Sequence, residues 1–197
     1  MTFAPRSPQL ARQAEPGRTL QKAMALVLGS SLLWASAKVQ VPFWPVPMTM
    51  QTYVVLLLGP LLGRRLGAGV VLTYLAEGAI GFPVFAGHTN GLGLGYFVGP
   101  TAGYLVGYLA AVVLAGTLAE HGWDQSVRGR VMTLLVAEIT ILAIGCGWLA
   151  TTYGWETALA IGLWPFLLGD GLKLAFAIGT LSFVKQRLSR SSNELEP

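Results

Sequence analysis

Long apolar segments recur along the whole chain and constrain its fold more than any other feature. A membrane-crossing helix needs about 20 predominantly apolar residues, and several segments approach or exceed that length. Only 11% of the 197 residues are charged, against about 25% in soluble domains. We therefore predict an all-α integral membrane protein with six transmembrane helices, near residues 20–37, 48–63, 66–83, 97–119, 130–152 and 157–187.

The last apolar segment is too long for one straight crossing. Proline suits the first turn of a helix, so Pro165 predicts a short outer segment at 157–163 followed by a spanning helix. The chain then divides into three parts. We expect a disordered cytoplasmic leader at 1–19, a six-helix transmembrane substrate-binding domain at 20–187 and a cytoplasmic tail at 188–197.

The cationic residues predict the orientation of the chain. They flank alternate span ends: Arg6, Arg12, Arg18 and Lys22, then Arg64 and Arg65, then Arg128 and Arg130, then Lys185, Arg187 and Arg190. Only Lys38 falls in an opposite loop, and Lys173 lies inside a span. Because cytoplasmic loops carry an excess of Lys and Arg, we expect both termini in the cytoplasm of a multi-pass protein of the cell membrane.

Two outer connections differ in character from the inner ones. Residues 38–47 (KVQVPFWPVP) contain three prolines, which forbid a helix and stiffen the chain. Residues 83–95 (PVFAGHTNGLGLG) are rich in glycine and conformationally adaptable. We interpret both as lids over a pocket that opens outward, with ordinary surface loops as the alternative.

Polar side chains converge on the outer half of the membrane. Ionisable residues inside a membrane are costly and usually face a cavity or a partner, so the convergence favours a pocket with polar contacts. Each also has a structural reading: Asp170 and Lys173 can neutralise each other, Gln51 can cross-link helices, and Asn90 can support a turn. The group consists of Gln51, Glu77, His88, Asn90, Asp170 and Lys173.

Other polar and small residues are assigned no ligand contact. Glu138 is placed in the inner half of its span, apart from this group, for helix packing or contact with another subunit. Cys146 is the lone cysteine, so no intrachain disulfide and no cysteine-based metal cluster is expected. The scattered basic residues do not form a nucleic-acid patch.

Recurring small residues indicate faces where helices approach closely. One such face comprises Gly99, Gly103 and Gly107, which recur every four residues, and another comprises Ala25 and Gly29. A packing face needs a partner inside or outside the chain.

Four blocks together resemble the BioY family, the biotin-capturing S components of energy-coupling-factor (ECF) transporters. The resemblance covers about residues 20 to 187 and is specific in combination. The blocks are VPFWPVPMTMQTYVVLLLGPLLG (41–63), YLAEGAIGFPVFAG (74–87), GLGLGYFVGPTAGYLVGY (91–108) and WPFLLGDGLKLAFA (164–177).

The resemblance implies a biotin-binding membrane protein that works with a transmembrane T component and two ATP-hydrolysing A subunits. It implies that Asp170 and Lys173 hold the biotin head group, with a polar residue of the second outer loop, for which we choose Asn90. In the family a small-residue face such as Ala25 and Gly29 docks the T component. The chain itself lacks a phosphate-binding G-x-x-x-x-G-K-[ST] loop, so ATP is used by the partners and no cofactor is expected.

The chemistry of biotin suits these residues. An ionised Asp170 can accept from a ureido N–H, and Lys173 can donate to the ureido carbonyl. Aromatic residues at this depth can cover the bicycle, although an interfacial aromatic belt is an equal reading for some: Trp44, Tyr53, Trp164 and Phe166.

Other function classes fit the sequence less well. Another vitamin could occupy the same fold with different polar contacts. A membrane enzyme using Glu77 or His88 as a base is the second alternative, but the chain carries no nucleophile elbow and no H-E-x-x-H motif. A passive channel lacks the rings of like charge expected in a filter.

The orientation can be tested by cysteine labelling in a background that lacks Cys146. We expect cysteines introduced at Thr89 and Glu156 to react with an impermeant thiol reagent in intact cells, because both lie in outer segments. A cysteine at Ser126 should stay unlabelled until the membrane is permeabilised. Labelling at Ser126 alone would invert the topology.

Overall fold

The structure of the protein is a computed structural model that describes residues 16–87 and 93–193. Helices make up nearly all of it, as an all-α membrane protein requires. The elements in chain order are α1 (Pro16–Lys38), β1 (Gln40–Val41), β2 (Met48–Thr49), α2 (Gln51–Ala79), the 3₁₀ helix η1 (Gly93–Val98), α3 (Ala102–Glu120), the 3₁₀ helix η2 (Trp123–Gln125), α4 (Val127–Tyr153), α5 (Trp155–Gly162) and α6 (Trp164–Asn193).

Among the described helices, those long and apolar enough to cross a membrane hold five of the six predicted spans; the first span lies in α1, which is not one of them. Within the described residues, four helices are long and apolar enough to cross a membrane: α2, α3, α4 and the part of α6 from Leu167 to Arg187. Helix α2 holds two predicted spans, because its backbone leaves the helical conformation at Gly63 (φ 77°, ψ 166°). Helix α5 is the predicted short outer segment, and α6 begins beside Pro165. The chain is a multi-pass membrane protein.

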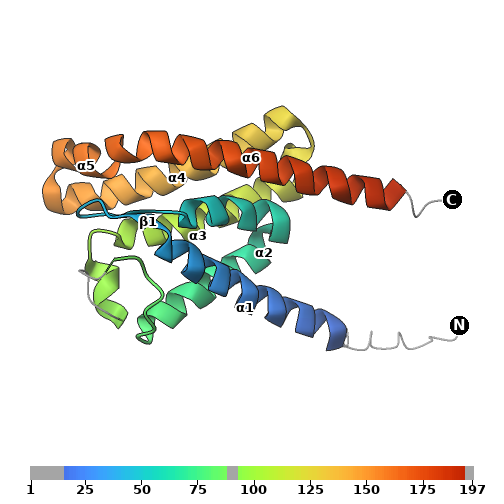
Figure 1. Ribbon diagram of the computed structural model, residues 1–197, viewed down its shortest axis with the longest axis horizontal. Helices are drawn as coiled ribbons and strands as arrows, with labels where there is room; N and C mark the ends of the chain where they lie inside the picture. The colour runs from blue at the N-terminus through green and yellow to red at the C-terminus, as the bar shows by residue number, and fades with distance from the viewer. Residues whose placement is uncertain (1–15, 88–92, 194–197) are drawn as a thin grey trace, which may run out of the picture.

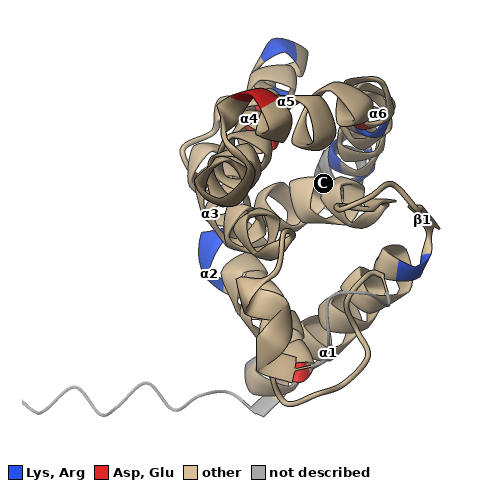
Figure 2. Cartoon of the chain, turned by 90° about the vertical axis from the view of Figure 1, so that its left-hand side faces the viewer, with Lys and Arg blue, Asp and Glu red and all other residues tan. Residues whose placement is uncertain are grey.

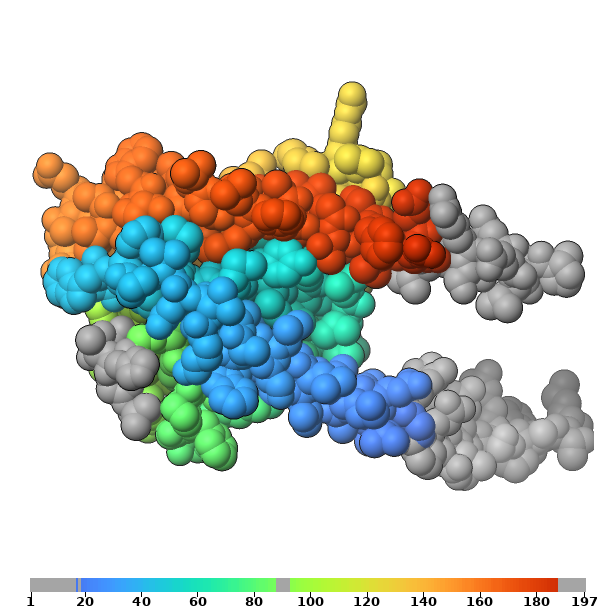
Figure 3. Space-filling view, in the orientation of Figure 1, coloured from blue at the N-terminus to red at the C-terminus, as the bar shows by residue number. Residues whose placement is uncertain are grey.

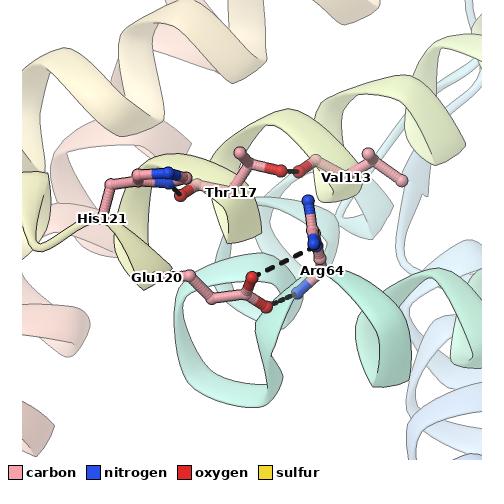
Figure 4. A network of polar contacts seen from close by, with 5 residues as sticks. All are labelled: Arg64, Val113, Thr117, Glu120 and His121. Atoms are coloured by element: carbon pink, nitrogen blue, oxygen red, sulfur yellow. Dashed lines mark hydrogen bonds and ion pairs between the residues drawn. The ribbon is translucent and has the colours of Figure 1, made fainter.

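Glu120 at the end of α3 supports the break in α2 (Figure 4). Its Oε1 accepts from the backbone N–H of Arg64 at 2.9 Å, and its Oε2 pairs with the Arg64 guanidinium at 3.2 Å. A helix start leaves backbone N–H groups without intrahelical partners, so this carboxylate satisfies one of them. The Thr117 hydroxyl on the preceding turn donates to the Val113 carbonyl at 2.7 Å.

The start of α1 and the end of α6 lie at the same end of the bundle, with α5 and the β1–β2 hairpin at the opposite end (Figure 1). This arrangement fits the even number of crossings predicted from the sequence. In the hairpin, Gln40 pairs with Thr49 and Val41 with Met48 in antiparallel register. Seen from the α5 end, charged residues are few and scattered over the chain (Figure 2).

The proline-rich segment between the two strands lies across α6 (Figure 3). Phe43 packs edge-on against Phe166, with ring centroids 6.1 Å apart. Three prolines keep this segment from continuing α1, so the chain turns over the outer end of the bundle before α2 begins. The segment thereby packs against the first turn of α6 at Phe166.

Close contacts between glycines and neighbouring backbones bring α2, α3 and α4 together. A Cβ on Gly59 would lie 2.7 Å from the backbone nitrogen of Gly116, and a Cβ on Gly107 would lie 3.0 Å from the Cα of Ile141. Gly103 packs in the same way against Trp148 of α4. The predicted small-residue face of α3 is therefore a packing face inside this chain.

The inner end of α6 is tied to the rest of the bundle by charged groups. Lys185 forms an ion pair with the fully buried Asp124 of η2. Arg130 donates from Nε to the Ser182 hydroxyl at 3.0 Å and from Nη1 to the backbone oxygen of Asp124 at 3.1 Å. These contacts fix α6 at the end opposite the hairpin.

Candidate ligand-binding site

A small cavity lies between the hairpin segment, α2, α3, α4 and α6. Its volume is about 40 Å³, whereas pockets that hold drug-sized ligands measure about 300 to 1,000 Å³. Its wall includes Val46 and Pro47 of the first outer connection and Ala86 of the second. Because both outer connections form its wall, their displacement would enlarge it.

Asp170 and Lys173 form a buried ion pair in the wall of this cavity. Three positions on a helix bring both side chains to one face, and Lys173 Nζ donates to Asp170 Oδ1 at 2.7 Å. Asp170 is 3% exposed and Lys173 is 6% exposed. Isolated charges at this depth would be costly, so each makes the other tolerable.

Gln51 also lines the cavity, at the first turn of α2. Its Nε2 donates to the Tyr74 hydroxyl at 2.7 Å, and Tyr74 donates onward to the backbone oxygen of Val84 at 3.0 Å. Thr49 donates to Gln51 Oε1 at 3.2 Å. This chain of hydrogen bonds connects both halves of α2 to the second outer connection and holds the amide in place.

Aromatic side chains complete the wall. Phe166 stacks on Tyr104, with ring centroids 6.2 Å apart, and the Tyr104 hydroxyl donates to the backbone oxygen of Gly162 at 2.7 Å. Tyr96 donates to the backbone oxygen of Ala86 at 2.7 Å. Tyr108 lies one helical turn beyond Tyr104 on the same face of α3 and also lines the cavity.

Sequence reasoning missed these three tyrosines. A signal was present in the segment GYLVGY, where Tyr104 and Tyr108 stand four positions apart on a helix whose glycines approach α4. Buried tyrosine hydroxyls need polar partners, and backbone oxygens of Gly162 and Ala86 supply them to Tyr104 and Tyr96.

The structure brings four of the eight predicted ligand-contact residues to the cavity: Asp170, Lys173, Gln51 and Phe166. Trp44 and Trp164 are 76% and 64% exposed and lie outside it. Trp164 stands two positions before Phe166, about 200° around the helix, so it points away. Asn90, like His88, lies outside the described residues and stays a prediction.

Tyr53 contributes to a different surface. It stands about 200° around α2 from Gln51 and shares a hydrogen bond with Thr180 of α6 at 2.9 Å. It also lines an apolar groove of about 330 Å³ between α1 and the first half of α2. Ala25 and Gly29 line the same groove.

Gly29 has a second role inside the chain. A Cβ added to Gly29 would lie 2.6 Å from a methyl carbon of Val70, so this glycine lets α1 approach the second half of α2. Glu77 strengthens the same contact by accepting from the Ser30 hydroxyl at 2.8 Å. In the described chain Glu77 therefore links two helices, and it is not among the residues that line the cavity.

Glu138 lies close to the ion pair, and the prediction that it sits apart was wrong. Its side chain is buried on α4 and interacts electrostatically with both Asp170 and Lys173. The depth estimate failed because α4 begins at Val127 and runs for 27 residues, which places Glu138 near the middle of the helix. The site therefore contains three ionisable groups from two helices.

Among the described residues no group of three His, Cys, Asp or Glu side chains forms a candidate metal site. The geometry defines an α-helical multi-pass membrane protein with a small polar cavity under two outer connections.

Comparison with known proteins gives the family. The sequence profile described as the BioY family matches residues 9–190. The chain belongs to the BioY family.

Several relatives are similar over most of their length. A probable biotin transporter BioY of Pyrococcus horikoshii is 36% identical over 150 residues, covering 75% of this chain and 86% of that protein. The biotin transporter BioY of Thermotoga maritima is 33% identical, with the same shares covered. The biotin transporter BioY of Rhizobium etli is 37% identical over 143 residues, covering 68% of this chain and 75% of that protein.

A solved structure has the same fold. The S component for biotin from an ECF-type ABC transporter superposes with a TM-score of 0.76, covering 87% of this chain and 94% of that chain, at 23% identity. The chain therefore shares the overall fold of that structure.

The three ionisable groups predict an asymmetric response to mutation in the ligand-free protein. Lys173→Met leaves two buried carboxyl groups without a cation and should cost about 3 to 5 kcal/mol of stability, as for other broken buried pairs. Asp170→Asn should cost less, because Glu138 remains to neutralise Lys173. Thermal unfolding in detergent measures both.

A matched control is the exposed pair of Arg64 and Glu120, whose side chains are 45% and 42% exposed. Glu120→Gln keeps an oxygen that can accept from the Arg64 backbone and should cost less than about 1 kcal/mol. Equal losses for Lys173→Met and Asp170→Asn would show that Glu138 does not compensate.

Proposed function

We propose that this protein is a biotin-specific S component of an ECF-type vitamin uptake transporter in the cell membrane. It captures biotin from the outer side, and both termini lie in the cytoplasm. The names of its relatives and the S-component fold support this proposal. In this role the chain binds and delivers its substrate and catalyses no reaction.

The buried pair of Asp170 and Lys173 is the observation that carries the proposal. The ureido group of biotin offers two N–H donors and one carbonyl acceptor on a compact ring. Lys173 donates to Oδ1 of Asp170, so Oδ2 can accept from a ureido N–H, while the Lys173 ammonium can also donate to the carbonyl. Hydrogen bonds to charged groups are roughly twice as strong as neutral ones.

The remaining cavity residues suit the apolar and polar edges of the same ligand. Phe166 and Tyr104 offer ring faces to the bicycle, and Gln51 offers an amide from the first turn of α2. Asn90 is proposed to contribute from the second outer loop. Since the cavity is smaller than the ligand, entry requires the outer connections to move away from α6.

We also propose that the protein assembles with a transmembrane T component and ATP-hydrolysing A subunits. The groove between α1 and α2 supports this, because its walls are apolar and it includes Ala25 and Gly29. A small-residue face permits close approach of another transmembrane helix. Gly29 serves contacts inside the chain as well, which makes Ala25 the better position for a test.

Biotin binding to the purified protein tests the proposed substrate. We expect Asp170→Asn to weaken binding about ten- to hundredfold, since a charge-assisted hydrogen bond is worth roughly 1.5 to 3 kcal/mol. Isothermal titration of folded wild type and variants provides the measurement. Wild-type binding of another vitamin in preference to biotin would contradict the assignment.

Ligand analogues distinguish which end of biotin the pair holds. Desthiobiotin keeps both N–H groups and should lose only packing, whereas an analogue methylated on the ureido nitrogens should fail to bind. Biotin methyl ester should bind well if Lys173 contacts the carbonyl. If the ester loses as much affinity as Lys173→Met does, Lys173 pairs with the carboxylate instead.

The partner surface can be tested with two alanines of α1. Ala25→Leu should block assembly with the T component and ATP-driven uptake while leaving biotin binding intact, because it fills the groove. Ala23→Leu is the control, since Ala23 is exposed and does not line the groove. Co-purification with the T and A subunits is the readout, and equal assembly of both variants would refute this surface.

A further inference from the structure

Glu138 is a buried carboxyl group beside the site, and the proposed binding of biotin gives it no role. It is 5% exposed and lies one helical turn before Ile141 and Leu142 on α4. Those two residues line the cavity together with Asp170 and Lys173. Glu138 therefore sits directly beneath the cavity wall.

The hydrogen bonding of Glu138 is incomplete. Neither of its carboxyl oxygens accepts a hydrogen bond from a donor within the described part of the chain. The side chain nevertheless interacts with the Asp170 carboxyl group and the Lys173 ammonium. Ionised carboxylates only accept hydrogen bonds, so the two groups can bond to each other only when one of them carries a proton.

The charges of Asp170, Lys173 and Glu138, called the cluster below, also indicate that one carboxyl group carries a proton. Among the described residues that line the cavity, Lys173 is the one cation. It interacts with two carboxyl groups, those of Asp170 and Glu138. The tyrosines Tyr104 and Tyr108, which face the cluster from α3, are uncharged in their protonated form. With both carboxyls ionised the cluster would bury a net negative charge, which is expensive away from water. One bound proton makes it neutral.

We propose that Glu138 is a positioning residue that holds this proton and donates it to Asp170, so that ligand binding at the Asp170–Lys173 pair is linked to protonation of Glu138. The hydrogen bond orients the Asp170 carboxylate while Lys173 holds its Oδ1. The effect on biotin affinity rests on the proposed function, whereas the bound proton does not.

The sign of the pH effect follows from the charge count. A ligand that fills the cavity displaces water from the cluster, and removal of water favours the neutral, protonated form. Binding should therefore weaken as the pH rises and Glu138 loses its proton. The folded state of the ligand-free protein should lose stability in the same direction.

Two variants separate positioning from mere packing. Glu138→Gln is neutral at every pH and can donate an amide N–H to Asp170, whereas Glu138→Leu keeps a similar volume without a donor. The other ionisable groups that face this site, Asp170, Lys173, Tyr104 and Tyr108, are the same in wild type and in both variants, so only the side chain at position 138 differs between the profiles.

Biotin affinity is measured by isothermal titration from about pH 6 to about pH 9. We expect wild-type affinity to fall at least about tenfold over this range more than that of Glu138→Gln. Glu138→Leu should bind roughly tenfold more weakly than Glu138→Gln at the acidic end, where packing is equal and only the donor differs. Parallel pH profiles for wild type and Glu138→Gln would overturn the proposal.

Two ligand-free measurements keep this test independent of the substrate. Infrared spectroscopy of the wild type at neutral pH should show the carbonyl band of a protonated carboxylic acid that Glu138→Gln lacks. The thermal midpoint of the wild type should fall with rising pH more steeply than that of Glu138→Gln. If both hold and biotin binds at no pH, the proposed substrate is wrong and the bound proton stands; if the infrared band is absent, the proton is refuted.

Discussion

The lack of water inside a bilayer is the constraint on which this structure depends. A backbone polar group at membrane depth has no solvent to bond with, so each must be satisfied within the protein. Helices achieve this along their length, and the difficulty concentrates where a helix starts or breaks. At Gly63 the Glu120 carboxylate accepts from the Arg64 backbone, which allows α2 to turn between two crossings near the membrane surface.

The same constraint explains how the segments around the cavity are held in place. Gly59 and Gly107 let α3 approach α2 and α4 at backbone distance, so the three helices form a rigid wall. Tyr104 of α3 and Tyr96 of η1 donate their hydroxyls to the backbone oxygens of Gly162 and Ala86. Those segments lie beside the cavity, and their hydrogen bonds hold them to the helical wall.

The spans and four residues that line the cavity could be predicted from the sequence because both follow from local pattern. Apolar length and proline placement determined α5 and α6, and spacing alone put Asp170 beside Lys173. Tyr53 and Trp164 were assigned from their depth in the membrane alone. Each stands two positions from a residue that lines the cavity, about 200° around its helix, and so points away from it. Glu138 was misplaced because depth along α4 was counted from an approximate helix boundary, and an error of one turn moves a side chain by about 5 Å.

The three buried ionisable groups also limit which head group the cavity can accept. A cluster made of one ammonium, one carboxylate and one protonated carboxyl carries no net charge, so a neutral ligand leaves the buried charge unchanged. A ligand whose head group is anionic or cationic would add an uncompensated charge and bear its desolvation cost. A ureido ring is neutral, and its donors and acceptor match the two ends of the Asp170–Lys173 pair. The carboxylate of biotin is then best placed at the far end of the ligand, toward the outer connections and water, where its charge is cheaply solvated.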